Sequence, residues 1–334
     1  MPFNLDAAVS CPHCPLGFCV EDRRTRRVTG RDTKFRLKQA VALACTFDAL
    51  VPGTDADPMP TRTFDEYIGQ FRVNALAAGL QLFGPDFKLG TSALAKVEGD
   101  VFELIEAAAL WNAAATWNNW MDGRPWSSTA LTRPTAVPTP TRKVALVKLP
   151  RGYDATRLFH RDVRNRIAAH EHALQAQGMG LGLSCPDIVA IRVPEPITPE
   201  FEQCLHPLTS LGESERQRLE DFHQRIEGTL QPQSFLAAIA VKRTTRSDRL
   251  YQPLFEANVL KYLVQEILLG AAFRFHVHLG SFAGADVERH YRAASLVSLL
   301  RGGGPALAVD RLWLATGPLA TAQMILDELP LFPY

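Results

Sequence analysis

Apolar and polar residues alternate along the chain in blocks that predict a mixture of helices and strands. In Lys34–Leu50 and Ala93–Trp117, apolar residues recur every three or four positions, and this spacing predicts two amphipathic helices. Short apolar runs bounded by Pro, Gly or charged residues predict strands. The predicted strands are Lys143–Leu149, Asp187–Val193, Ser234–Val241, Arg274–Leu279 and Arg311–Ala315.

Two further helices and one irregular connection complete the predicted order of elements. Pro253 suits a first helical position, so we expect a helix from there to about Leu269. Another helix is expected within Val287–Leu300. The segment Met121–Thr141 is rich in Pro, Thr and Ser, which predicts a long irregular connection. Strands that alternate with helices indicate an α/β fold in which helices flank a mixed sheet and extra N-terminal helices pack against it.

The composition is that of a globular protein with a substantial core and does not by itself indicate a function. The chain has 334 residues, of which 46% are apolar and 21% charged, and its net charge is +1. No apolar run reaches the ~18 residues of a spanning helix, and the start lacks a secretory signal pattern. We therefore expect a soluble cytoplasmic protein without a membrane partner. Positive charge is local, in Glu21–Lys38 and around Arg246–Arg249, as in proteins that bind nucleic acid with one basic face.

The cysteines are too few and too scattered for a disulfide framework in a chain of this length. Cys11, Cys14 and Cys19 cluster near the start. Their Cys-x2-Cys pair could supply half of a zinc site, but no second pair follows, so a loose reduced segment is favoured. His276 and His278 alternate on a predicted strand, and no carboxylate or cysteine lies near them in the sequence. A structural role is therefore favoured over a metal site.

Charged residues at the ends of two predicted strands suggest a site for phosphodiester hydrolysis. Asp187 opens one strand and Lys242 closes another, so a carboxylate and an ammonium would lie side by side if these strands are neighbours. Glu256, in the first turn of the next predicted helix, adds a second carboxylate. Carboxylates can hold one or two Mg²⁺ ions, and a lysine can offset the charge of the phosphate. The alternative is ordinary surface charge at strand ends.

The segment Arg246-Ser247-Asp248-Arg249 begins four residues after Lys242. Arginine can donate two hydrogen bonds to O6 and N7 of guanine, and aspartate can accept one from N4 of cytosine. Two arginines on either side of an aspartate therefore suit a target made of C and G. The alternative is an exposed Arg–Asp ion pair on a loop, which would contribute little.

These motifs resemble those of the type II restriction endonucleases that cut sites containing CCGG, the NgoMIV-like branch of the PD-(D/E)XK nucleases. The resemblance begins near Arg31 and is strongest in VKRTTRSDRLYQPLFEANVL. It is looser in AKVEGDVFELIEAAALWNAAATWN, RPTAVPTPTRKVALVKLPRGYD and GLGLSCPDIV. Residues 1–30 depart from the family. We therefore expect one domain over residues 31–334, with a helical part at 31–120 and a catalytic α/β core at 143–330.

The resemblance implies a role for each matching residue. Asp187 would be the main metal ligand and Lys242 the catalytic lysine. Glu256 would replace the acid that the family's usual pattern has two positions before the lysine, where this chain has Ala240. The resemblance further implies that Glu103 is an active-site acid and metal ligand, that the carbonyl of Val241 binds metal, and that DNA is contacted by Arg246, Ser247, Asp248, Arg249, Arg31 and Lys96.

The resemblance also implies a cofactor and partners. We expect two Mg²⁺ ions per active site, with Mn²⁺ as a substitute, and double-stranded DNA as the substrate. A homodimer on a palindromic site would let one Arg246–Arg249 segment per subunit read half of the CCGG core. Higher-order assembly on DNA and a cognate DNA methyltransferase in the same bacterial cell are also expected. Two alternatives stay open: a PD-(D/E)XK nuclease of DNA repair or recombination, and a catalytically silent sequence-specific DNA-binding protein.

Overall fold

A computed structural model of the chain describes most of residues 91–334, and only short pieces before residue 91. The gaps after residue 91 are 139–140, 183–184, 209–212, 245–246, 271–272, 284–285 and 301–303. Before residue 91, the described residues are 20–21, 35–36, 62–69, 72, 73, 76 and 85. The N-terminal cysteine cluster, Arg31 and Arg246 lie outside the described residues.

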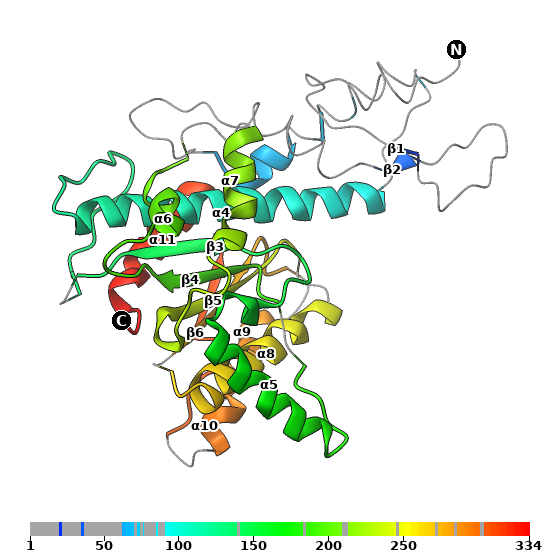
Figure 1. The fold of residues 1–334 in the computed structure, drawn as a ribbon. Coiled ribbons are helices and arrows are strands. Elements are labelled where there is room, and N and C mark those ends of the chain that lie inside the picture. The colour runs from blue at the N-terminus through cyan, green and yellow to red at the C-terminus, as the bar shows by residue number, and fades with distance from the viewer. Residues whose placement is uncertain are drawn as a thin grey trace.

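A mixed five-stranded sheet forms the centre of the molecule (Figure 1). Its strands lie in the order β3 (Val144–Lys148), β4 (Ile188–Arg192), β5 (Phe235–Lys242), β6 (Arg274–Leu279) and β7 (Arg311–Leu314). β4 is antiparallel to both β3 and β5, whereas β5, β6 and β7 are parallel. Almost every residue of β3 to β6 is buried. Burial on both faces explains why these strands are continuous apolar runs in the sequence.

Helices cover both sides of the sheet, which confirms the predicted fold class (Figure 1). One side carries α4 (Thr91–Met121), α6 (Pro199–Glu202), α7 (Glu213–Arg225) and α11 (Pro318–Glu328). The other side carries α5 (Arg161–Gln175), α8 (Ser247–Lys261) and α10 (Leu296–Leu300). The smaller elements are α9 (Val287–Tyr291), a π-helix at Tyr262–Ile267, and 3-10 turns at Ala155–Leu158, Gln203–Leu205, Pro232–Ser234 and Leu329–Leu331. Among the helices that the structure describes, none combines the length and hydrophobicity that crossing a bilayer would require.

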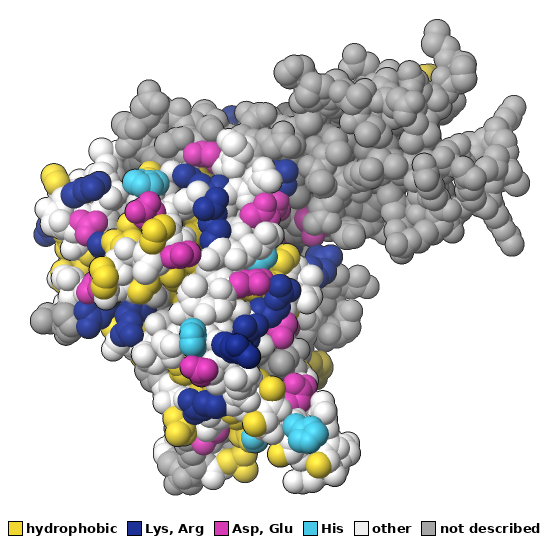
Figure 2. Space-filling view, viewed as in Figure 1, with side chains coloured by type: hydrophobic (Ala, Val, Ile, Leu, Met, Phe, Trp, Pro, Cys, Tyr) yellow, Lys and Arg dark blue, Asp and Glu magenta, His cyan; other side chains and the backbone are white. Residues whose placement is uncertain are grey.

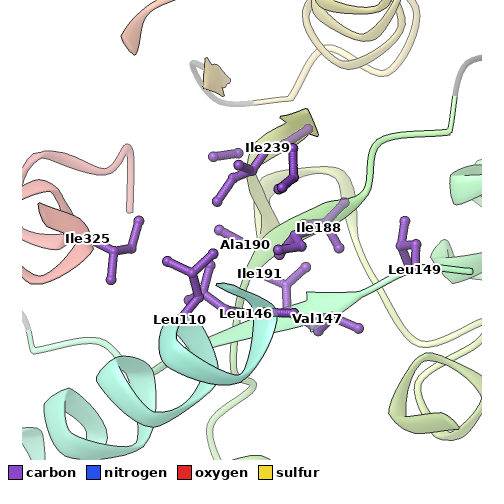
Figure 3. Close-up of a cluster of buried hydrophobic side chains, with 14 of the residues drawn as sticks. Leu110, Leu146, Val147, Leu149, Ile188, Ala190, Ile191, Ile239 and Ile325 are labelled. Carbon is purple, nitrogen blue, oxygen red and sulfur yellow. The ribbon is translucent and has the colours of Figure 1, made fainter. Parts of the chain in front are cut away.

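The core forms where α4 packs on the sheet and on α11. Figure 3 shows Leu110 of α4 next to Leu146 of β3, with Ile325 of α11 close by. Asn118 of α4 exchanges two hydrogen bonds of 2.8 Å with the backbone of Val144, at the start of the outer strand β3. Burial from Val101 to Trp117 and the bonds of Asn118 near its C-terminal end thus fix α4 against the sheet, so it can hold side chains at the strand ends in a defined place.

Three predicted elements differ from the structure. Phe35–Arg36 form a short strand, β2, which pairs with β1 (Val20–Glu21). The predicted helix Lys34–Leu50 is therefore wrong at its start, because local periodicity does not reveal a pairing with a distant segment, and residues 37–50 lie outside the described part. The predicted helix within Val287–Leu300 is divided into α9 and α10. The chain leaves helical geometry between them because Ala294 pairs with Leu307 across an isolated bridge.

The third difference concerns the start of α8, which lies at Ser247 and not at Pro253. Proline removes one backbone hydrogen bond from a helix and crowds the preceding turn. Leu250, before the proline, is as deeply buried as Ala257 and Leu260 after it. Burial of this continuous apolar stripe outweighs the local preference of proline for a first helical position.

Candidate active site

The antiparallel pairing of β4 and β5 brings Asp187 and Lys242 together. β4 begins at the end of the sheet where β5 finishes, since Ile188 is aligned with Ile239. We call this end of the strands the edge. Lys242 Nζ donates a hydrogen bond of 2.7 Å to Asp187 Oδ2, and the backbone N–H of Val241 donates one of 2.7 Å to the same oxygen. A carboxylate and an ammonium thus lie side by side at this edge.

Lys242 is held in its charged form by the acids around it. Its side chain is 16% exposed and that of Asp187 is 17% exposed. Burial by itself would lower the pKa of the Lys242 ammonium, but Asp187, Glu256 and Glu103 outweigh burial and raise this pKa. At neutral pH Lys242 can therefore donate hydrogen bonds and offset negative charge, but it cannot accept a proton.

Glu256 reaches the same place from α8. The residue is 3% exposed, and Gln252, one helical turn earlier, donates a hydrogen bond of 2.7 Å to its Oε1. The charge of Glu256 contributes to the raised pKa of Lys242 and to that of the Cys185 thiol. Burial first, and then the charges of Asp187 and Glu256, raise the pKa of Cys185 to about 11. Cys185 is therefore a neutral thiol beside a group of carboxylates and not a thiolate ligand.

Glu103 enters the site from α4 and pairs with a lysine at the end of β3. Lys148 Nζ lies 2.6 Å from Glu103 Oε1, and the two side chains are 11% and 17% exposed. Burial raises the pKa of the Glu103 carboxyl, and the charge of Asp187 adds to this, whereas Lys148 and Lys242 oppose it. Glu103 is thus within electrostatic range of both Asp187 and Lys242.

Two more acids of α4 attach this helix to the same end of the sheet. Glu98 pairs with Arg243, which follows β5 directly. Glu106 contacts Nδ1 of His278 on β6, and both residues are fully buried. Burial, and then the charge of Asp187, raises the pKa of Glu106 well above its usual range. Burial lowers the pKa of His278 to about 3, so both shifts favour uncharged side chains.

The Glu106–His278 contact corrects one detail of the sequence analysis. The sequence shows no carboxylate near the histidine pair, yet the structure supplies one, because Glu106 of α4 reaches His278 of β6. Glu106 and His278 are both fully buried and the shifts of their pKa values favour neutral forms, while the structural role of His276 and His278 stays a prediction.

The acids at this edge fit a hard cation better than zinc. Asp187, Glu256 and the carbonyl of Val241 offer oxygen ligands, which Mg²⁺ prefers. Within the described residues, no three His, Cys, Asp or Glu side chains come close enough together to enclose a metal ion. Mg²⁺ does not need such a cage, because it usually keeps several waters and binds one or two carboxylates together with substrate phosphates.

The predicted DNA-reading residues are described only in part. Ser247, Asp248 and Arg249 form the first turn of α8, and Lys96 lies in α4, but their side chains are not among those described. On the face shown in Figure 2, Lys and Arg side chains form short groups with Asp or Glu beside them. Positive charge on this face is therefore local.

Two further residues at this end of the sheet, Lys148 and Gln252, contact the predicted acids. Lys148 interrupts the apolar run VALVKL at the end of β3, and the antiparallel pairing with β4 aligns it with Ile188. A lysine at the end of a buried strand could be noticed in the sequence, but its position next to Glu103 and Asp187 depends on the order of the strands. Gln252 could be found from its spacing, since it precedes Glu256 by four residues on one helix.

Comparison with known proteins gives one family and several solved structures. The sequence model of the Cfr10I/Bse634I restriction endonuclease family matches residues 55–328. The fold is similar to a crystal structure of the type IIF restriction endonuclease Bse634I with cognate DNA, with a TM-score of 0.68 and 19% identity over 88% of this chain and 93% of that one. A second structure of Bse634I restriction endonuclease has a TM-score of 0.68 and 18% identity over 89% and 94% of the two chains. No curated protein sequence matches the chain significantly.

Proposed function

Because the chain belongs to the Cfr10I/Bse634I restriction endonuclease family, we propose that it cleaves double-stranded DNA at a specific palindromic site containing CCGG, in a reaction that requires Mg²⁺. The observation that carries this proposal is the contact of 2.7 Å between Lys242 and Asp187 at the end of the two central strands. A charged lysine beside a carboxylate that would bind a metal ion supports metal-dependent hydrolysis of a phosphodiester.

Each residue of the site has a proposed task. Asp187, Glu256 and the carbonyl of Val241 would hold Mg²⁺, with Glu103 as a further acid, and Mn²⁺ would substitute. When bound, one or two such ions would polarise the phosphate and lower the pKa of an attacking water. Lys242 keeps its proton because its contact with Asp187 and the charges of Glu256 and Glu103 raise its pKa, so it would offset the charge that develops on the phosphate.

The segment after β5 would read the bases. Arg246 and Arg249 would bind the guanines of a half-site, Asp248 the cytosines, and Ser247 would lie in the same contact. The finer assignment within the family is to SgrAI-like enzymes, which implies a longer degenerate site such as CRCCGGYG, cut before the CCGG core. Arg31 would read base pairs outside that core and Lys96 would contact DNA from α4.

A homodimer follows from the symmetry of the proposed site. One Arg246–Arg249 segment per subunit suffices for a palindrome if two subunits share its two-fold axis. DNA-bound dimers would assemble into larger particles. The protein would act in the bacterial cytoplasm, in a cell that also contains a cognate DNA methyltransferase.

The proposal is tested by incubating the protein with a plasmid of known sequence and Mg²⁺, and sequencing the fragment ends. Ends that share one CCGG-containing site are expected, and cleavage should stop in excess EDTA. Cuts without a common sequence would favour a nuclease that reads DNA shape. Binding of one sequence without any cut would favour a silent DNA-binding protein.

Lys242→Ala tests the site itself. We expect a loss of cleavage of at least about 100-fold, the usual effect of removing one group that stabilises transition-state charge, with cognate binding retained. Lys261→Ala is the matched control, because Lys261 is also a buried lysine and its Nζ lies 2.8 Å from Asp310 Oδ2, outside the candidate site. Equal cleavage by wild type and Lys242→Ala would refute the role of Lys242.

Arg249→Ala should weaken binding to the cognate site far more than binding to random DNA. An equal loss on both would make Arg249 a phosphate contact.

A further inference from the structure

The turn after β3 lies against the candidate active site. The N–H of Leu149 donates a hydrogen bond of 2.9 Å to the backbone carbonyl of Asp187. The carbonyl of Pro150 accepts from the N–H of Tyr153 at 3.0 Å, and the thiol of Cys185 donates to it at 3.3 Å. The turn 150–153 is thus tied to the segment that leads into Asp187, and Arg151 lies on this turn.

Arg151 differs from the other cations at this edge in its exposure. The side chains of Lys148, Lys242 and Arg243 are 11%, 16% and 19% exposed, and each is engaged by a carboxylate of the site or of α4. The side chain of Arg151 is 72% exposed. Among these four, Arg151 can therefore reach a ligand that approaches from solvent.

A buried acid holds the guanidinium of Arg151 in place. Nη2 of Arg151 lies 3.0 Å from Oδ1 of Asp100, whose side chain is only 4% exposed. Asp100 lies on α4, one turn before Glu103, so the same rigid helix positions both. A guanidinium has five N–H donors in one plane. Contact with one carboxylate on the inner side leaves donors on the outer side for a second anion.

We propose that Arg151 binds a phosphate of the DNA backbone beside the cleaved bond, with Asp100 as the residue that positions it. The inference rests on the proposed function, since that function brings a DNA strand to the edge where Asp187 and Lys242 lie. Arg151 would contact the backbone only, so it would strengthen binding to any DNA sequence and would carry no base specificity.

The salt dependence of binding tests this contact directly. Each phosphate contact contributes about 0.9 to the slope of log K against log salt, so a dimer with two copies of Arg151→Gln should lose about 1.8. Between 50 and 200 mM salt, wild-type affinity should then fall about 12-fold more than that of the variant. Binding is measured in EDTA, so that no cleavage occurs, with a cognate and a random duplex.

Arg157→Gln is the matched control. Arg157 is also exposed, at 55%, and its Nη2 also forms an ion pair of 3.0 Å, with Glu227 Oε2. Its salt slope should equal that of wild type. Arg151→Lys should recover most of the slope, because the charge is kept.

A second measurement locates the phosphate. Single uncharged methylphosphonates are placed along the cognate strand one at a time. One position near the cleaved bond should weaken binding by wild type and leave binding by Arg151→Gln unchanged. If Arg151→Gln fails to fold because the buried charge of Asp100 is no longer balanced by Arg151, the double variant Asp100→Asn/Arg151→Gln removes both charges and should show the same loss of slope.

The outcomes separate this inference from the proposed function. An unchanged slope in a folded Arg151 variant, or an equal loss in Arg157→Gln, would overturn the phosphate contact even if the wild type cleaves CCGG sites. A wild-type protein that binds neither duplex would overturn both proposals.

Discussion

Gly280→Ala is expected to damage the site without removing any of its chemical groups. Gly280 follows β6, and its N–H donates a hydrogen bond of 3.0 Å to the carbonyl of Lys242. A Cβ at this position would lie 2.9 Å from the carbonyl oxygen of Arg243 and 3.3 Å from its Cα. Both atoms belong to the backbone directly after Lys242, so they cannot move aside as the tip of a long side chain can.

The size of the effect follows from this contact. Overpacking in a filled region costs about 1–3 kcal/mol, so the free energy of unfolding should fall by that amount. Arg243 is bonded to Lys242, and its shift would move the Lys242 ammonium relative to Asp187. Since a displacement of about 1 Å can cost about 100-fold in rate, we expect cleavage of bound DNA to slow by about 10- to 100-fold.

Urea unfolding and single-turnover cleavage at saturating DNA measure the two effects separately. Gly180→Ala is the control, because a Cβ there meets no atom within 4 Å. Wild-type stability in Gly280→Ala would show that the backbone at Arg243 can yield. A loss of stability with an unchanged cleavage rate would refute the link from Gly280 to Lys242.

Three other substitutions give distinct outcomes. The pKa of Glu106 is raised above 4.5 in the folded state, so its contribution to stability is present below pH 4.5 and lost as pH rises through the folded value. Glu106→Gln has no carboxyl to titrate, so it removes this pH-dependent loss of stability. Above pH 4.5 the unfolding free energy of the variant relative to wild type, measured with urea, should therefore rise by at most about 1.4 kcal/mol per pH unit. A difference that stays constant with pH would contradict this. Lys148→Gln removes a charge-assisted hydrogen bond to Glu103 and should lower the unfolding free energy, measured with urea, by about 1.5–3 kcal/mol. A variant as stable as wild type would disprove this. Gly99 lies inside α4, and a Cβ added there would meet no atom within 4 Å. Gly99→Ala should therefore raise the melting temperature by an amount that corresponds to about 0.5–1 kcal/mol of unfolding free energy. A lower melting temperature would mean that the helix is crowded at this position.

The strands and α4 could be predicted because burial leaves a direct trace in the sequence. β3, β4 and β5 are enclosed on both faces, so each is a short apolar run with polar residues at its ends. α4 is enclosed on all sides along most of its length, so apolar residues occupy most positions between Val101 and Trp117. In these elements the local pattern and the tertiary structure require the same residues.

Features that depend on distant pairing could not be read in the same way. The adjacency of Asp187 and Lys242 was conditional on β4 and β5 being neighbours, and the place of Lys148 depended on β3 lying next to β4. The strand at Phe35–Arg36 exists only through its pairing with Val20–Glu21. Local periodicity contains no information about such partners, so sequence reasoning could name the charged residues but could not determine their contacts.

Lys242 ends β5 at the centre of the sheet, and α8 begins at Ser247. Under the proposed roles, Lys242 promotes hydrolysis and Arg246–Arg249 select the sequence, so one short piece of backbone fixes both. Glu256 lies on α8, the same helix that begins with this segment. Target choice and catalysis are then not interchangeable modules. Under these roles, exchanging the segment to change the target sequence would also shift Lys242, so variants with altered preference should tend to cleave slowly.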